Sequence, residues 1–416
     1  MKTIGIICEY NPFHNGHAKQ LRLIRERYGT DAVIVCLMSG NYVQRGEPAI
    51  FDKAMRAEAA VRCGADLVLE LPITYALRSA EGFADGGVEI LDSLGVDVLC
   101  FGCECGDDSI IMSTAKTLLT PEFDALLRRE LERGVCYAAA REAAVASCLG
   151  MTDVTLLRSP NNILAVEYCK ALTKRNSRME PFAIMREGDY HGTAANDENP
   201  SASFLRLQML AGGVWRNGVP AEAADLYDAA PRYTMAAGER AVLARVRTVP
   251  EAAFEALPFG SEGLWRKLMH ACRNEANVEA IIHATKSKRY ARTRIQRMLM
   301  CAYLGITESV MSAQAPYVRI LAFNKQGRQL LHRFVKSMHE SSTDGNRQDL
   351  ASCETAPRVP LVNAGTIPPD KTYYAMECRA SDLYTLFRAD ETRLTCGQEQ
   401  KNRIFYQDLE KNTCNP

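Results

Sequence analysis

Two histidines three residues apart lie at the start of a predicted helix. The apolar run at residues 3–8 does not alternate, which favours a strand buried on both faces, and His14 and His17 follow it after a polar turn. Their spacing places both imidazoles on one face, where free N–H groups and the helix dipole favour an anion. Gly16 would let a phosphate approach the backbone closely. The segment predicts a nucleotide triphosphate site in which the imidazoles donate hydrogen bonds to phosphate oxygens.

Two other interpretations of this pair remain. Histidines at a helix start can simply cap the helix or lie in a solvated turn. They could also share a metal ion, but no third ligand follows at a recognisable spacing, so we expect no metal site. The 15 cysteines are scattered from Cys8 to Cys414, which argues against structural zinc and indicates mostly small buried side chains.

A second candidate is a basic cluster with no acidic residue inside it. An apolar stripe on one side predicts a helix that displays cations on the other side. Such a face could bind RNA phosphates, or it could be a solvated face balanced by acidic neighbours in space. The cations are Lys286, Lys288, Arg289, Arg292, Arg294 and Arg297.

Alternating strands and helices must position these residues. Non-alternating apolar runs, separated by stretches of helical periodicity, predict an α/β fold with a doubly wound parallel sheet of the Rossmann-like type. Ligands of such sheets bind beyond the carboxyl ends of the strands. The loops to inspect therefore begin at Glu9, Ser39, Pro72 and Gly102.

The chain divides into three predicted regions. Residues 1–215 form the ATP-binding catalytic domain, and residues 216–335 form a mainly helical, basic domain. Residues 336–416, which begin with a stretch rich in Ser, Thr, Asp, Gly, Asn and Pro, are expected to be a polar insertion and a partly flexible C-terminal segment.

Composition limits the classes of partner. Fifty basic and fifty acidic residues leave no net charge, so attraction to a polyanion must come from a local cluster. No apolar run reaches transmembrane length and no signal-peptide pattern opens the chain, so we expect no membrane partner and a cytoplasmic, reducing location. The composition assigns no oligomeric state.

Three strings of sequence resemble a known family. The segment 13–17 is similar to the H-x-G-H signature of adenylyl-transferring nucleotidyltransferases and class I aminoacyl-tRNA synthetases. Together with two later strings, it resembles the tRNA(Met) cytidine acetate ligases, and weaker similarity extends over roughly the first 320 residues. The strings are Glu9–His17, Met38–Ala49 and Gly64–Pro72.

This resemblance implies an enzyme that activates acetate with ATP as acetyl-adenylate, with Mg2+ bound through the phosphates. The acetyl group would then pass to the wobble cytidine of elongator methionine tRNA, and the basic cluster would contact the tRNA. Its ATP site would use the residues Ile7, Cys8, Glu9, Tyr10, Asn11, Pro12, Phe13, His14, Asn15, Gly16, His17, Ala18, Lys19, Gln20, Gly102, Asn162 and Arg186.

The resemblance also implies a second phosphate-binding element. Ser203 and Arg206 would act with His14 and His17 in catalysis, although the threonine usual in this element is absent. The alternative is that Ser203 caps a helix and Arg206 is solvated. The loop Ser39–Ala49 is expected to close over the adenylate.

Two other functions remain possible from the sequence. One is a small-molecule adenylyltransferase or carboxylate-activating ligase that needs no tRNA. The other is a non-catalytic RNA-binding protein that retains a nucleotide pocket.

Overall fold

A parallel sheet forms the centre of the molecule. The computed structural model describes residues 2–151, 155–186, 200–343, 359–390 and 392–408. The central strands are β1 (Thr3–Cys8), β2 (Val33–Ser39), β5 (Leu67–Leu71), β6 (Val98–Cys103) and β7 (Glu180–Met185). They lie in the order β7-β6-β1-β2-β5 with parallel pairings throughout. The order of connection reverses between β1 and β6, which marks the edge where such sheets bind ligands.

Helices cover both faces of this sheet. The covering helices are α1 (Asn15–Tyr28), α2 (Lys53–Arg62), α4 (Ala80–Ser93) and α8 (Pro160–Lys174). On one face α1 packs Leu21 in the core that contains Cys36, and on the other face α4 packs Phe83 in the core that contains Val35. Successive residues of β2 therefore enter opposite cores, which explains its continuous apolar run. The predicted α/β, doubly wound sheet is confirmed.

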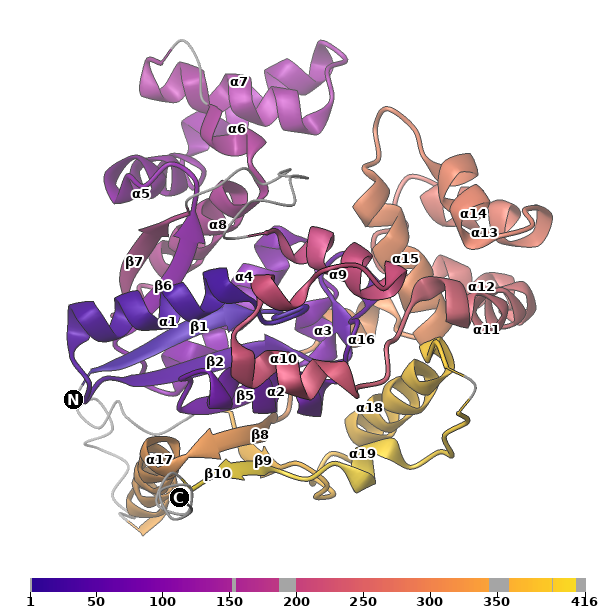
Figure 1. Cartoon of the computed structure of the whole chain (residues 1–416). Helices are drawn as coiled ribbons and strands as arrows, with labels where there is room; N and C mark the ends of the chain where they lie inside the picture. The colour runs from indigo at the N-terminus through magenta and orange to yellow at the C-terminus, as the bar shows by residue number, and fades with distance from the viewer. Residues whose placement is uncertain (1, 152–154, 187–199, 344–358, 391, 409–416) are drawn as a thin grey trace.

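Two further groups of helices lie beside the sheet (Figure 1). One group, at the top of the view, contains α5 (Asp108–Thr117), α6 (Pro121–Glu132) and α7 (Tyr137–Leu149). The other group, on the right, contains α11 (Met235–Thr248), α12 (Glu251–Glu255), α13 (Leu264–Asn274), α14 (Val278–Thr285) and α15 (Arg292–Leu304). Its apolar core, which includes Val246, Leu268 and Met298, also takes in Tyr42, Leu77 and Tyr384 from outside the group. No helix in the described ranges is long and apolar enough to cross a bilayer.

The C-terminal part of the chain extends the sheet, which differs from the predicted division. The additional strands are β8 (Val318–Asn324), β9 (Leu361–Asn363) and β10 (Phe405–Gln407). β8 pairs antiparallel with β5, and both β9 and β10 pair parallel with β8. Thus β8, which falls in the range expected to be helical, belongs to the sheet. These pairings join segments far apart in the chain, which local periodicity cannot reveal.

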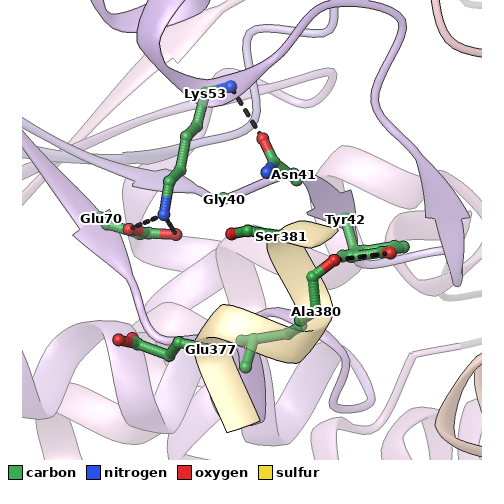
Figure 2. A pocket seen from close by; sticks show the side chains of 9 residues that line it. Gly40, Asn41, Tyr42, Lys53, Glu70, Glu377, Ala380 and Ser381 are labelled. Carbon is green, nitrogen blue, oxygen red and sulfur yellow. Dashed lines mark hydrogen bonds and ion pairs between the residues drawn. The ribbon is translucent and has the colours of Figure 1, made fainter. Parts of the chain in front are cut away.

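A buried cluster of charged side chains ties the C-terminal region to the sheet, and Figure 2 shows three of its members, Lys53, Glu70 and Glu377. Lys53, at the start of α2, donates hydrogen bonds to Glu70 of β5 (2.7 and 2.9 Å) and to Glu399 of α19 (Gln398–Lys401; 2.8 and 2.9 Å). Arg319 of β8 also pairs with Glu399 (3.1 Å) and with Glu377 of α18 (Lys371–Tyr384; 2.9 Å). The cluster therefore joins α2, β5, β8, α18 and α19 through charges that have little contact with solvent.

The surroundings shift the ionisation of these groups. Burial disfavours the Lys53 ammonium, but Glu399 and Glu70 raise its pKa. Burial and the nearby Glu70 carboxylate raise the pKa of Glu377 to about 7. Lys53 opposes the effect of burial on Glu399 and lowers its pKa. Removing one partner of a buried pair leaves an uncompensated charge. The loss of any one of these side chains therefore costs more stability than the intact pair contributes.

We predict that Lys53→Met lowers the free energy of unfolding by about 3–5 kcal/mol near neutral pH. Burial already raises the pKa of Glu70, and without the ammonium it should rise further, while the pKa of Glu399 should rise from its lowered value to above its unfolded one. Protonation then favours the folded state, so the loss should shrink as the pH falls from about 8 to about 5. Urea unfolding across this range measures the effect.

Arg62→Met is the matched control on the same helix, because Arg62 forms a more exposed pair with Glu58. It should cost less than about 1 kcal/mol at every pH. Equal losses in the two variants, or a Lys53→Met loss that does not depend on pH, would contradict the proposed electrostatic tie.

Candidate active site

A tight turn after β1 delivers the two histidines to the carboxyl edge of the sheet. Tyr10 has φ +46°, and Asn11–Pro12 is a cis peptide bond. The Asn11 side chain accepts a hydrogen bond from the backbone N–H of Ile50 (2.8 Å). The backbone N–H of Phe13 donates to the Tyr227 hydroxyl (3.2 Å). The turn is thus held by long-range contacts on both sides of Pro12.

The two imidazoles together cap the N-terminus of α1. His14 is the N-cap, and its Nδ1 accepts from the backbone N–H of Gly16 (3.1 Å). The Nδ1 of His17 accepts from the backbone N–H of His14 (3.3 Å), and the two rings stack with centroids 3.8 Å apart. A neutral imidazole that accepts at Nδ1 carries its proton on Nε2. Both histidines therefore retain an N–H at Nε2 for a ligand.

Burial keeps both imidazoles uncharged. His14 is 3% exposed, and burial, with a smaller effect from the Arg186 charge, lowers its pKa to about 3. Burial, the His14 ring and Arg186 together lower the pKa of His17 well below its ordinary value. At neutral pH the pair therefore acts as two fixed hydrogen-bond donors, and the adjacent positive charge belongs to Arg186.

Gly102 and Arg186 lie at the neighbouring strand end. Gly102 is in β6, and Arg186 follows β7, with its backbone N–H bonded to the Cys103 oxygen (2.8 Å). A Cβ on Gly102 would lie 3.2 Å from Cγ of Arg186, so the arginine stem crosses the bare glycine. This position is beside the β1–β6 reversal, and both residues belong to the ATP site that the resemblance implies.

Arg206 and Ser203 reach the same turn from α9 (Ala202–Ala211). Arg206 donates to the Asn11 backbone oxygen (2.7 Å) and to the Ser203 hydroxyl (3.1 Å). The helix is capped by Ser201, whose hydroxyl accepts from the backbone of Phe204 (3.2 Å), so Ser203 is not the cap. Its hydroxyl and Arg206 remain beside the loop that carries the histidines.

Asn162 bonds to the loop after β6, whereas the resemblance implies that it contacts the nucleotide. Its side-chain oxygen accepts from the backbone N–H groups of Glu104 (2.8 Å) and Cys105 (3.2 Å), and its own backbone N–H donates to the Glu104 carboxylate (2.9 Å). The amide oxygen thus fixes the loop after β6. Only the amide nitrogen is left for the nucleotide contact that the resemblance implies.

The other residues of the segment 7–20 form the walls and support of the turn. Ile7, Cys8, Tyr10 and Phe13 are buried in the cores. The remaining residues, from α1, lie half-buried: Asn15, Ala18, Lys19 and Gln20. The Asn15 amide donates to the Asn217 backbone oxygen (2.8 Å), and that of Gln20 to the Cys100 sulfur (3.5 Å).

Sequence reasoning missed Arg56 of α2, which holds the strand ends in place. Its side chain is fully buried and donates to the backbone oxygens of Phe51 (2.9 Å), Glu9 (2.6 Å), Ser39 (3.1 Å) and Gly40. It therefore joins the carboxyl ends of β1 and β2. No pattern in the sequence marks this arginine, because its partners are backbone oxygens of residues distant in the chain.

The loop at residues 39–49 is a packed hairpin, which does not fit the expected closing loop. The Gln44 backbone N–H donates to the Glu9 carboxylate (2.6 Å), and the Tyr42 hydroxyl donates to the Ala380 backbone oxygen (3.0 Å). The hairpin is thus fixed both to the turn after β1 and to α18. Its strands are β3 (Tyr42–Val43) and β4 (Glu47–Pro48).

The basic cluster is not the continuous helix face that the sequence predicts. Residues 286–291 connect α14 to α15, which begins at Arg292. Lys286 and Lys288 lie exposed in this connection and form no ion pair with any residue of the described ranges.

Two of the arginines have acidic partners. Arg289 pairs with Glu262 (2.7 Å), and Arg292 forms two hydrogen bonds with Glu279 (2.5 Å each). The alternative of a face balanced by acidic neighbours therefore applies to these two arginines. Phosphate binding by either would have to compete with its carboxylate.

Arg297 does not project into solvent, which corrects its expected place on the exposed face. It is 7% exposed and lies over the Phe259 ring, 5.2 Å from the centroid, and burial lowers its pKa to about 10. The backbone of Gly46 packs closely against this turn of α15. A Cβ on Gly46 would lie only 2.6 Å from the backbone nitrogen of Arg297. The hairpin covers this part of α15.

The fold and the paired histidines define a nucleotidyltransferase class. The model of the family described as HIGH Nucleotidyl Transferase matches residues 1–399. A Thermotoga maritima TmcAL crystal structure in the apo form superposes with a TM-score of 0.84 at 27% identity, covering 98% of this chain and all of that one. A form bound with alpha-thio ATP superposes with a TM-score of 0.82.

Relatives with curated names identify the family more narrowly. A tRNA(Met) cytidine acetate ligase of Syntrophotalea carbinolica is 39% identical over 350 residues, which cover 80% of this chain and 82% of that protein. The ligase of the same name from Acetivibrio thermocellus is 33% identical over 97% of this chain and its own full length. The chain belongs to the tRNA(Met) cytidine acetate ligase family.

We predict that Gly16→Ala weakens ATP binding about ten-fold or more, because the new Cβ would lie 2.9 Å from Cε1 of His14 and must displace that ring. Isothermal titration with ATP measures the loss. Gly29→Ala, at the other end of α1, is the control, because no atom lies within 4 Å of its Cβ position. Gly29 has φ +88°, so this control can lose stability but should keep its affinity for ATP. Unchanged ATP affinity in Gly16→Ala would contradict the phosphate role of His14.

Proposed function

We propose that this protein acetylates the wobble cytidine of elongator methionine tRNA, using acetate and ATP and releasing pyrophosphate and AMP. The names of its relatives support the tRNA and the acetate. The observation that carries the chemistry is the capped histidine pair, which directs two Nε2–H donors and the Arg186 charge to one strand edge. A reaction that needs ATP and tRNA together suits a cytoplasmic location.

In the first step an acetate oxygen attacks the α-phosphorus of ATP. A bond from that oxygen to phosphorus forms, the bond to the bridging oxygen breaks, and pyrophosphate leaves with the electron pair. His14 and His17 donate hydrogen bonds to the phosphate oxygens, whose charge grows in the transition state. Arg186 adds a positive charge, while Ser203 and Arg206 hold the departing pyrophosphate.

In the second step the exocyclic amine of the cytidine attacks the acetyl carbonyl of the adenylate. The new carbon–nitrogen bond forms as the carbon–oxygen bond to AMP breaks, and the amine loses one proton. The cytidine must leave its stack to present this amine. Arg56 keeps the loops after β1 and β2 fixed during both steps, through its bonds to backbone oxygens.

Mg2+ would neutralise the charge on the phosphates. Among the described residues, no cluster of three or more His, Cys, Asp and Glu side chains could hold a metal ion. An ion that the phosphates of ATP carry with them would need no protein-built cage.

We predict that His17→Ala reduces acetate-dependent ATP–pyrophosphate exchange by a factor on the order of 100–1,000, because one fixed donor to the reacting phosphate is lost. tRNA binding should remain nearly unchanged. Purified protein incubated with ATP, labelled acetate and tRNA provides the second readout, in which the wild type labels the tRNA and the variant does not.

The control is His270→Ala, since His270 is exposed on α13. Its exchange rate and tRNA labelling should match the wild type. Full activity in His17→Ala would defeat the phosphate assignment, and wild-type label on a small metabolite in place of tRNA would replace the proposed acceptor.

We also propose that the connection between α14 and α15 contacts tRNA phosphates through Lys286 and Lys288. Replacing both lysines by alanine should weaken tRNA binding and reduce the slope of log affinity against log salt concentration by about 1–2. ATP–pyrophosphate exchange should not change.

The matched control for this pair is Lys116→Ala with Lys174→Ala, two exposed lysines on α5 and α8. It should leave both the affinity and the salt slope as in the wild type. Equal effects of the two double variants would show that the connection makes no specific contact.

A further inference from the structure

A cavity of about 160 Å3 lies between the hairpin and the helical group. Helices α11, α14 and α15 form most of its wall, and β4 closes one side. An apolar cavity of roughly 150 Å3 is large enough to accept a single six-membered ring. The apolar lining consists of Met235, Val242, Val278, Ile282, Leu299 and Met300.

One edge of this cavity is polar. Gln296, which is 8% exposed, donates a hydrogen bond through its amide nitrogen to the Glu47 carboxylate (2.8 Å), and both residues line the cavity. This bond uses one amide hydrogen and one carboxylate oxygen. A ring that offers an amine beside an acceptor nitrogen could donate to Glu47 and accept from the second amide hydrogen of Gln296. Cytosine presents this pattern, and carboxylates accept from its exocyclic amine.

The rim of the cavity carries charge suited to a nucleic acid. Arg292 and Glu279 pair at the rim, where α15 begins. The connection with exposed Lys286 and Lys288 joins α14 and α15, two of the helices that line the cavity. A base that enters would therefore bring its phosphates close to these cations. A small apolar metabolite or a peptide side chain would leave them unused.

The hairpin that borders the cavity also contacts the turn that leads to the histidine pair. On one side of the hairpin, Gln44 contacts Glu9, which follows β1. Two residues further along, Gly46 packs on α15 and borders the cavity. The hairpin therefore links the cavity to the turn that follows β1, while none of the residues that line the cavity belongs to that turn.

We propose that this cavity holds an unstacked pyrimidine of the tRNA, distinct from the reacting cytidine. Glu47 and Gln296 read its edge, the apolar wall contacts its ring, and the lysines of the connection bind its phosphates. This inference rests on the proposed action on tRNA. It adds a second base contact that would help select the RNA loop.

Met235→Trp tests the subsite, because Met235 is only half-buried at the wall and a larger side chain there would fill the cavity. The variant should bind tRNA about ten-fold more weakly, as expected for the loss of one base contact, with unchanged ATP–pyrophosphate exchange. Met151→Trp, at a surface position away from the cavity, should bind tRNA as the wild type does. Glu47→Gln provides a variant of the same shape and should weaken binding in the same direction.

A set of tRNAs with single abasic pyrimidines completes the test. One abasic position should weaken wild-type binding and have little further effect in Met235→Trp, since both changes remove the same contact. Additive losses at every position, or full affinity in Met235→Trp and Glu47→Gln, would overturn the subsite. Failure of the wild type to bind tRNA would instead contradict the proposed function.

Discussion

The proposed nucleotide site depends on the mutual capping of His14 and His17. Because each Nδ1 accepts a backbone N–H, each ring must carry its proton on Nε2, and burial keeps both rings uncharged. Two neutral donors are therefore already fixed, and the proposed reaction would need little reorganisation as phosphate charge develops. Gly16 is required because any side chain at that position would collide with the His14 ring.

The rest of the fold supports this arrangement through α2. At one end of the helix, Lys53 joins it to Glu70 and Glu399, which ties the C-terminal region to the sheet. One turn later, Arg56 binds the backbone oxygens of Glu9 and Ser39 at the ends of β1 and β2. The buried charge cluster and the nucleotide site thus share one rigid element. A displacement of the C-terminal region would therefore be passed through α2 to the loop that carries the histidines.

The sequence predicted those features of the fold and the site that depend on local patterns of residues. The continuous apolar runs indicated the doubly wound sheet, which is confirmed, and the spacing of the two histidines placed them at one helix start. It could not predict contacts between distant segments. The pairing of β8 with β5, and the bonds from Arg56 to backbone oxygens, leave no local trace. Arg297 fits the basic helical pattern, yet packing against the hairpin buries it.

The most direct test is 15N NMR of the His14 and His17 side chains, with and without an ATP analogue. The expected spectrum at neutral pH shows both rings as the neutral Nε2–H tautomer, with the His14 pKa near 3, and both Nε2–H resonances shift when the analogue binds. Rings that titrate near their ordinary pKa of about 6.5, or that do not respond to the analogue, would contradict the account.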